Sequence, residues 1–91
     1  MLKRKINGIL TVLAALNAIG SDEITMFKLQ ELTKIRNYNT LNRAVSILKE
    51  VGFIEERYER GPPVRRFIKL TEKGRRAAQL AKELLELAGE L

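Results

Sequence analysis

Two groups of polar side chains in this chain have types and spacings suited to nucleic-acid binding. The first occupies one side of a predicted helix and consists of the hydrogen-bond donors Asn39, Asn42, Arg43 and Ser46. The opposite side of that helix is an apolar stripe at i, i+3, i+4, i+7 spacing, formed by Leu41, Ala44, Val45 and Leu48. The second group is a cluster of arginines at the tip of a predicted hairpin, Arg60, Arg65 and Arg66. A polar, basic helix face beside a basic hairpin suggests a surface that grips a nucleic acid.

Three helices must position the first group. An amphipathic helix is expected from about Lys3 to Ile19, and a very short strand over Glu23–Thr25 follows a turn at residues 20–22. Thr25 is expected to cap a second helix from Met26 to about Ile35, with Met26, Leu29, Leu32 and Thr33 facing inward. After a turn over residues 36–38, Asn39 is the expected cap of a third helix, Thr40–Val51, which Gly52 ends. Two short helices joined by a tight turn form the outline of a helix-turn-helix.

A hairpin and a last helix complete the chain. Side chains alternate over Phe53–Glu59 and again over Val64–Leu70, as in two strands, and the stiff loop Arg60-Gly61-Pro62-Pro63 joins them. Thr71 is expected to cap a final helix that runs to about Gly89 or to the end of the chain. The predicted class is mainly α with a small β-hairpin, that is α+β.

The final helix carries a coiled-coil seam. Its apolar residues recur at intervals of 3, 4, 3 and 4, at Ala77, Leu80, Leu84, Leu87 and Leu91. Packing on the first helix is one explanation. The apolar face is wider than one small neighbour would cover, however, because it extends to Ala78, Ala81, Leu85 and Ala88. We therefore expect a homodimer contact here, with residues 1–76 binding DNA and residues 77–91 dimerising, within one domain.

Composition argues against an enzyme. The chain has 91 residues, no cysteine and no histidine, and Asp22 is its only aspartate. Most nucleophile–base pairs and metal-ligand sets are thereby removed, so we expect no catalysis, no metal and no cofactor. The net charge of +6 is concentrated in residues 34–76, which alone hold a net of +7 where phosphates could meet it.

The N-terminus permits another interpretation. Lys3, Arg4 and Lys5 precede an apolar stretch, as in a secretion signal. The polar residues Asn7, Thr11 and Asn17 interrupt that stretch, and removing it would strip the core. It is also too short and too polar to span a membrane. We expect a cytoplasmic, nucleoid-associated protein without a membrane partner.

The expected elements follow one another as three helices, a two-stranded wing and a last helix. With this order of elements, the sequence resembles a winged helix-turn-helix domain. The phrases Leu48–Arg57 and Leu70–Arg75 are similar to the "L-x-x-x-G-x-I-x-x-R … L-T-x-x-G-R" pattern of MarR-type and PadR-type regulators. Gly61-Pro62-Pro63 followed by Arg65-Arg66-Phe67 looks most like PadR-type wings. The resemblance covers roughly residues 23–76. These relatives usually carry longer terminal helices, and the compact chain looks more like the small winged-helix proteins of archaea and their viruses.

The resemblance implies a dimer on operator double-stranded DNA, with the third helix (39–51) in the major groove and the wing (57–66) on the backbone or minor groove. It puts Asn39, Thr40, Asn42, Arg43 and Ser46 at base edges or nearby phosphates. Expected phosphate ligands are Lys34, Arg36, Arg57, Arg60, Arg65 and Arg66, and Tyr38 joins this predicted surface. Arg43 suits guanine and Asn42 suits adenine. A transcriptional regulator, acting as a repressor, is the predicted function.

Two other functions stay open on the sequence. An architectural chromatin protein of the same fold would bind unrelated duplexes with near-equal affinity. A winged helix used for protein interaction would present apolar side chains on the third helix, where Ile47 is partly outward.

Overall fold

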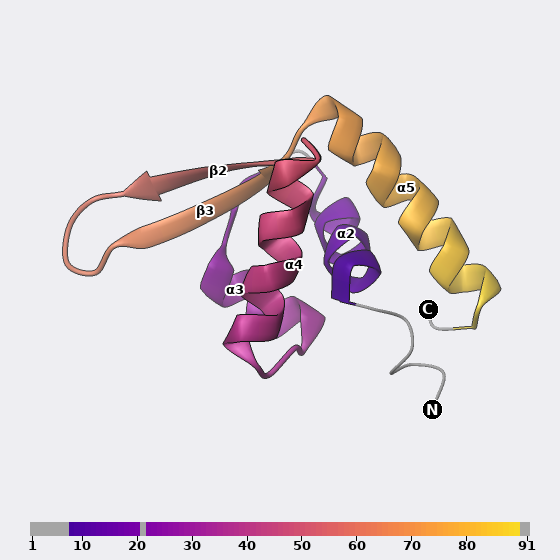
Figure 1. The fold of residues 1–91 in the computed structure, drawn as a ribbon, viewed down its shortest axis with the longest axis horizontal. Helices are drawn as coiled ribbons and strands as arrows, with labels where there is room; N and C mark the ends of the chain where they lie inside the picture. Colours follow the sequence, from indigo (N-terminus) through magenta and orange to yellow (C-terminus); the bar gives the residue numbers. More distant parts are fainter. Residues whose placement is uncertain (1–7, 21, 90–91) are drawn as a thin grey trace.

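The computed structural model describes residues 8–20 and 22–89 and contains helices and a small sheet in the predicted order (Figure 1). The elements are α2 (Gly8–Ile19), β1 (Ile24–Thr25), α3 (Met26–Thr33), α4 (Tyr38–Glu50), β2 (Ile54–Glu59), β3 (Arg65–Leu70) and α5 (Glu72–Leu87). The three strands form one antiparallel sheet in the order β1-β3-β2. The predicted α+β class is confirmed. No helix in the described ranges is both long enough and apolar enough to cross a membrane.

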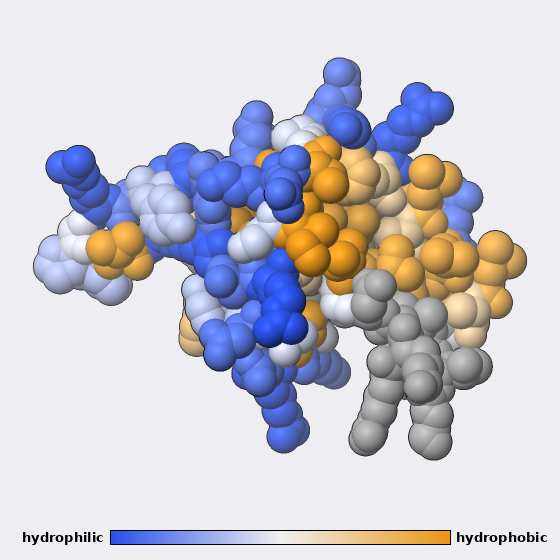
Figure 2. All heavy atoms as spheres, in the orientation of Figure 1, coloured by the Kyte–Doolittle hydropathy of each residue, from blue (hydrophilic) through white to orange (hydrophobic). Residues whose placement is uncertain are grey.

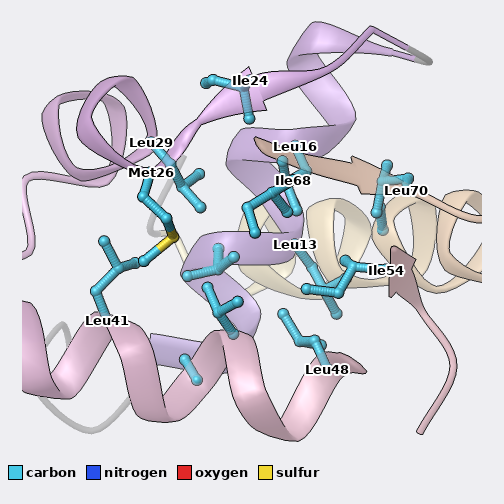
Figure 3. Packing of buried hydrophobic residues seen from close by; sticks show 14 of the residues in the cluster. Leu13, Leu16, Ile24, Met26, Leu29, Leu41, Leu48, Ile54, Ile68 and Leu70 are labelled. Atoms are coloured by element: carbon cyan, nitrogen blue, oxygen red, sulfur yellow. The ribbon is translucent and has the colours of Figure 1, made fainter. Parts of the chain in front are cut away.

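Helix α2 is the centre of the domain. Helices α3, α4 and α5 all contact it, and Val12, Leu13 and Leu16 are buried. Leu13 and Leu16 point into the same core as Leu41 and Leu48 of α4 and Ile68 of β3 (Figure 3). Within Gly8–Ile19 only Ala18 is exposed, so this part of the predicted helix is covered on nearly every side rather than on one face. Residues 3–7 of the predicted helix lie outside the described residues.

Helix α3 starts as predicted but ends earlier. The Thr25 hydroxyl accepts a hydrogen bond from the Lys28 amide at 3.1 Å, which confirms the cap. The helix stops at Thr33, not Ile35, because Lys34 adopts a left-handed backbone with φ of 59°. The expectation that Leu32 faces inward is wrong, since its side chain is 46% exposed. Each step of three residues falls about 60° short of a full helical turn, so Leu32 has rotated away from the core that Met26 enters.

Helix α4 begins earlier than predicted. Its cap is Asn37, whose Oδ1 accepts hydrogen bonds from the amides of Asn39 at 2.8 Å and Thr40 at 3.3 Å. The prediction of Asn39 as the cap is therefore wrong. Two asparagines of equal capping ability stand two residues apart, and the sequence does not distinguish them. Because the helix starts at Tyr38, the side chains of Tyr38 and Asn39 belong to the helix surface.

The end of α4 is joined to the start of α5. Gly52 has a φ of 83°, its amide bonds to Lys49 O at 3.0 Å, and the Phe53 amide bonds to Leu48 O at 2.9 Å. These two bonds form a Schellman motif and confirm the predicted helix stop. The Thr71 hydroxyl donates to Gly52 O at 2.7 Å and accepts from the Gly74 amide at 2.9 Å, so one side chain holds both helix ends.

The hairpin formed by β2, β3 and their loop has the predicted alternation. Ile54 pairs with Leu70 and Glu56 with Ile68, and these residues share one face with Tyr58 and Arg66. Ile54, Ile68 and Leu70 are buried on this face, toward α2 and α4 (Figure 3). The hairpin therefore inserts its base into the core and projects its far end away from the helices (Figure 1).

Gly74 lets α5 pass close to the loop after α4. A Cβ at this position would lie 1.7 Å from the Phe53 carbonyl oxygen, which accepts the Thr71 amide at 3.0 Å. No side chain movement can relieve a clash with a backbone atom. Only glycine fits here, although Gly74 lies within the helix.

We expect Gly74→Ala to lower the free energy of unfolding by about 3 kcal/mol, because the backbone near Phe53 must shift. Gly8→Ala is the matched control. A Cβ there meets its nearest atoms at ordinary distances of 3.7 and 3.9 Å, so we expect a change within about 1 kcal/mol. Urea unfolding followed by circular dichroism measures both, and equal stability of the two variants would contradict the assignment.

Candidate nucleic-acid interface

The polar side of α4 lies at the surface. The predicted apolar stripe is confirmed, since Leu41, Ala44, Val45 and Leu48 are buried in the core. On the other side Asn39, Thr40, Arg43 and Ser46 are exposed, Asn42 is partly buried, and Ile47 is 39% exposed. Hydrophilic residues gather over α4 and the hairpin, whereas hydrophobic residues gather over α5 (Figure 2). The predicted polar ridge is therefore available to a partner.

An open groove separates α4 from the hairpin. It is lined by Tyr38, Asn42, Ser46, Lys49, Glu50, Glu56, Tyr58 and Arg66. Four of these residues are not among the predicted site residues, namely Lys49, Glu50, Glu56 and Tyr58. Lys49 could have been found, because it lies seven residues after Asn42 and so follows it along the same side of the helix. Glu56 is placed in the groove by the strand register, and no local spacing in the sequence reveals that register.

Arg66 and Asn42, both predicted to contact DNA, are bonded to each other in this groove. Arg66 Nη1 donates to Asn42 Oδ1 at 2.6 Å and to the Tyr38 hydroxyl at 3.2 Å. The Arg66 Nε donates to Glu56, and Lys49 Nζ lies 3.0 Å from the same carboxylate. The Glu56 side chain is only 4% exposed and that of Arg66 is 16% exposed. Arg66 therefore serves an internal ion pair here instead of presenting a free cation.

Both members of this pair are charged. Burial raises the pKa of Glu56, but the hydrogen bonds and charges of Lys49 and Arg66 outweigh it and leave that pKa below the usual value. Burial lowers the pKa of Arg66, and its bonds to Glu56 and Tyr38 more than offset this, so the net shift is upward. The carboxylate thus fixes the guanidinium without losing its own charge.

Arg57 and Arg65 lie on the other face of the hairpin, away from α4. Two nitrogens of Arg57 donate to Glu23 at 2.7 and 2.8 Å, and the guanidinium stands 4.3 Å from the centre of the Phe67 ring. The hydrogen bond from Arg57 lowers the pKa of Glu23. Glu59 lies 3.7 Å from Arg57 and 3.8 Å from Arg65. Nearby carboxylates therefore partly neutralise both arginines, and the predicted hairpin cations are split between two faces.

The remaining predicted cations are exposed. They are Lys34, Arg36, Arg43 and Arg60, and none of them forms an ion pair within residues 8–20 and 22–89. Lys34 and Arg36 lie in the turn before α4, Arg43 on α4 and Arg60 at the tip of the hairpin. In the described part of the chain no cluster of acidic residues could hold a metal ion.

The predicted dimer seam on α5 is largely uncovered. Leu80, Leu84 and Leu87 are 62%, 49% and 86% exposed, Ala77 is partly buried against the core, and Leu91 lies outside the described residues. The alternative that this stripe packs on the first helix is therefore wrong for the three leucines. Of the residues expected to widen the exposed face, Ala88 is exposed, but Ala78, Ala81 and Leu85 form a row of α5 that is buried against the rest of the chain.

Solved structures share this arrangement. F-93 of the archaeal virus SSV1 is 25% identical with a TM-score of 0.68, covering 90% of each chain. AF1382 of Archaeoglobus fulgidus is 18% identical with a TM-score of 0.69, covering 88% of this chain and 86% of its own. YodB of B. subtilis, a transcriptional regulator, is 18% identical with a TM-score of 0.65 over 88% of this chain and 77% of its own. This chain has the winged helix-turn-helix fold.

The winged-helix likeness inferred from the sequence is thereby confirmed, including its likeness to proteins of archaea and their viruses. No family model matches the chain, and no curated protein matches it in sequence. In this winged helix, α3 and α4 are the helix-turn-helix, and the hairpin is the wing.

We expect Glu56→Gln to lower the free energy of unfolding at pH 7 by about 1–3 kcal/mol, because charge-assisted bonds to Arg66 and Lys49 are weakened. The difference from the wild type should depend on pH. The ordinary pKa of a glutamate, which applies to the unfolded chain, is about 4.5, and the pKa of Glu56 in the folded chain lies below it. The contribution of the charged Glu56 to the free energy of unfolding is therefore complete above the pKa of the unfolded chain. It is lost as the pH falls through the pKa of the folded chain.

Glu55→Gln is the matched control, since Glu55 is exposed on the opposite face of β2. Denaturant unfolding between pH 3 and pH 7 gives both differences. A Glu56→Gln deficit that stays constant down to pH 3, or one no larger than that of Glu55→Gln, would refute the charged pair.

Proposed function

We propose that this protein is a homodimeric, sequence-specific regulator of transcription that binds double-stranded DNA and acts as a repressor. Helix α4 enters the major groove, and the wing (57–66) meets the backbone or minor groove. The observation that carries the proposal is the exposed polar row of α4 with the exposed Arg43 at its middle. The winged-helix fold supports it, and YodB, which shares this fold, is a transcriptional regulator.

Phosphates are contacted by the exposed cations that form no ion pair among the described residues. Lys34 and Arg36 precede α4 and Arg60 lies at the tip of the hairpin, so they flank the helix that enters the groove. Each neutralised phosphate releases counterions, which makes affinity depend on salt. Arg65 adds to this set with part of its charge balanced by Glu59. Arg57 and Arg66 contribute less than the sequence indicated, because Glu23 and Glu56 hold them.

Bases are read from α4. Arg43 lies on the outward side of the helix, between Asn39 and Ile47 in the i, i+4 row. Its guanidinium can donate two parallel hydrogen bonds to O6 and N7 of guanine in the major groove. Asn39, Thr40 and Ser46 are exposed around it and contact neighbouring base edges or phosphates.

Dimerisation uses the exposed apolar stripe of α5. Leu80, Leu84 and Leu87 follow one side of the helix, and Ala77 begins the row. Three exposed leucines in line on a small basic protein are best covered by the same stripe of a second copy, related by a two-fold axis. Two copies of α4 then read a palindrome with half-sites about one helical turn of DNA apart.

We expect Arg43→Ala to weaken binding to a selected duplex by about 1–3 kcal/mol and to relax the preference at one base position of each half-site. Arg60→Ala is the contrasting control. It should weaken all duplexes alike and reduce the slope of log K against log salt by about one. Selection of bound duplexes from a random pool supplies the site, and fluorescence anisotropy supplies the affinities.

If Arg43→Ala weakens random and selected duplexes equally, base reading by Arg43 is refuted. If the wild type itself binds unrelated duplexes with near-equal affinity, the protein is an architectural DNA-binding protein instead. Binding to another protein that survives high salt, without DNA binding, would make it an interaction module.

We expect Leu84→Glu to convert the dimer to a monomer, because it places a charge at the middle of the α5 stripe. Gln79→Glu adds the same charge to the same helix outside the stripe, where Gln79 is exposed, and should leave the dimer intact. Sedimentation equilibrium measures both. Dimers of equal strength in the two variants would place the interface elsewhere.

A further inference from the structure

The side-chain amide of Asn42 has a fixed orientation. Its Oδ1 lies 2.6 Å from Arg66 Nη1. A guanidinium has donors and no acceptor, so only the oxygen of the amide can face it. One lone pair of the oxygen is thereby taken by a cation, and the NH₂ group, which can only donate hydrogen bonds, remains for a ligand.

Arg66 is held too firmly to release that oxygen easily. Its guanidinium is bonded at once to Glu56, Tyr38 and Asn42, and its side chain is 16% exposed. Glu56 is nearly buried at 4% exposed and is itself held by Lys49 at 3.0 Å. The pair therefore joins both strands of the hairpin to the side of α4 from which Asn42 projects.

We propose that Asn42 is a specificity-determining residue that selects guanine over adenine, and that Arg66 and Glu56 are the positioning residues that impose this choice. The inference rests on the proposed function. An unrestrained asparagine pairs with adenine, accepting from N6 and donating to N7. The oxygen keeps a second lone pair, but the Arg66 cation beside it repels the partly positive N6 amino group of adenine and so disfavours that pairing. Guanine presents O6 and N7, which are both acceptors and both suit an NH₂ donor.

This reverses the preference for adenine that the residue type alone indicates. It also gives the ion pair of the hairpin a role in reading sequence without contact with DNA. Asn42 and Arg43 are adjacent on α4, so the proposal requires two guanine preferences at different base positions of each half-site.

The test uses the full chain and a duplex selected from a random pool, with every base pair of the half-site substituted in turn. Asn42→Asp keeps an oxygen for Arg66 and removes the donor. We expect it to lose about tenfold in guanine-over-adenine discrimination at one position, distinct from the position lost in Arg43→Ala. Inosine has the major-groove acceptors of guanine, so replacing guanine by inosine there should leave wild-type binding unchanged.

Asn39→Asp is the matched control for the added charge. It should weaken all duplexes and leave the guanine preference assigned to Asn42 intact. The double variant Glu56→Gln/Arg66→Met removes the ion pair as a unit and frees the oxygen of Asn42. We expect this variant to gain affinity for adenine at the same position about tenfold relative to guanine. Thermal unfolding verifies that each variant is folded.

The outcomes separate this inference from the proposed function. If the wild type selects no preferred sequence, the sequence-specific function itself fails. If it selects a site and Asn42→Asp retains full discrimination at every position, or weakens all duplexes alike, only the role of Asn42 is overturned. Unchanged preference in the double variant would overturn the positioning role of Arg66 and Glu56.

Discussion

Beyond its buried base, the hairpin is held against α4 by one carboxylate, that of Glu56. A two-stranded hairpin alone is marginal in water. Here its base is anchored by Ile54, Ile68 and Leu70 in the core, and β1 adds a short third strand beside β3. On the face toward α4, the side chains beyond that base are polar or exposed, and the Glu56–Arg66 pair with its bonds to α4 continues the attachment. Because the pair is mostly shielded from water, it can fix geometry where an exposed pair would contribute little.

The cations of this molecule fall into two sets, those that are paired with carboxylates and those that are exposed and unpaired in the described part of the chain. The net charge of +6 counts every cation equally, yet several cations are bound to carboxylates within the fold. The face of the hairpin away from α4 carries alternating partners, with Glu59 between Arg57 and Arg65 and with Glu55 opposite Lys69. That face has little net charge to offer a phosphate. The exposed cations Arg36, Arg43 and Arg60 lie instead on and around α4 and at the hairpin tip, so the field that steers a polyanion is directed there.

Most of the fold could be predicted from the sequence, because the residues that start and stop its helices act locally. Thr25, Gly52 and Thr71 act within a few residues of themselves, and each takes the predicted role in the structure. The start of α4 could not be fixed, since Asn37 and Asn39 cap equally well. For the candidate site, exposure of the α4 ridge followed from periodicity. The bonds of Arg66 to Glu56 and Asn42 could not be predicted in this way. Strand register brings Glu56 to Arg66, and tertiary packing brings Asn42 to it, and neither produces a recognisable spacing in the sequence.

Helix α5 carries two apolar rows, one buried against the rest of the chain and one exposed. The row of Ala78, Ala81 and Leu85 is used within the chain, where small residues let α5 lie close to α2. The row of Leu80, Leu84 and Leu87 remains for a second copy in the proposed dimer. Helix α2 contacts both α5 and α4, and it is covered on nearly every side. Interiors packed in this way resist deformation. In the proposed dimer, rigid helix packing through α2 would set the separation of the two α4 helices, so that one half-site spacing would be favoured over others.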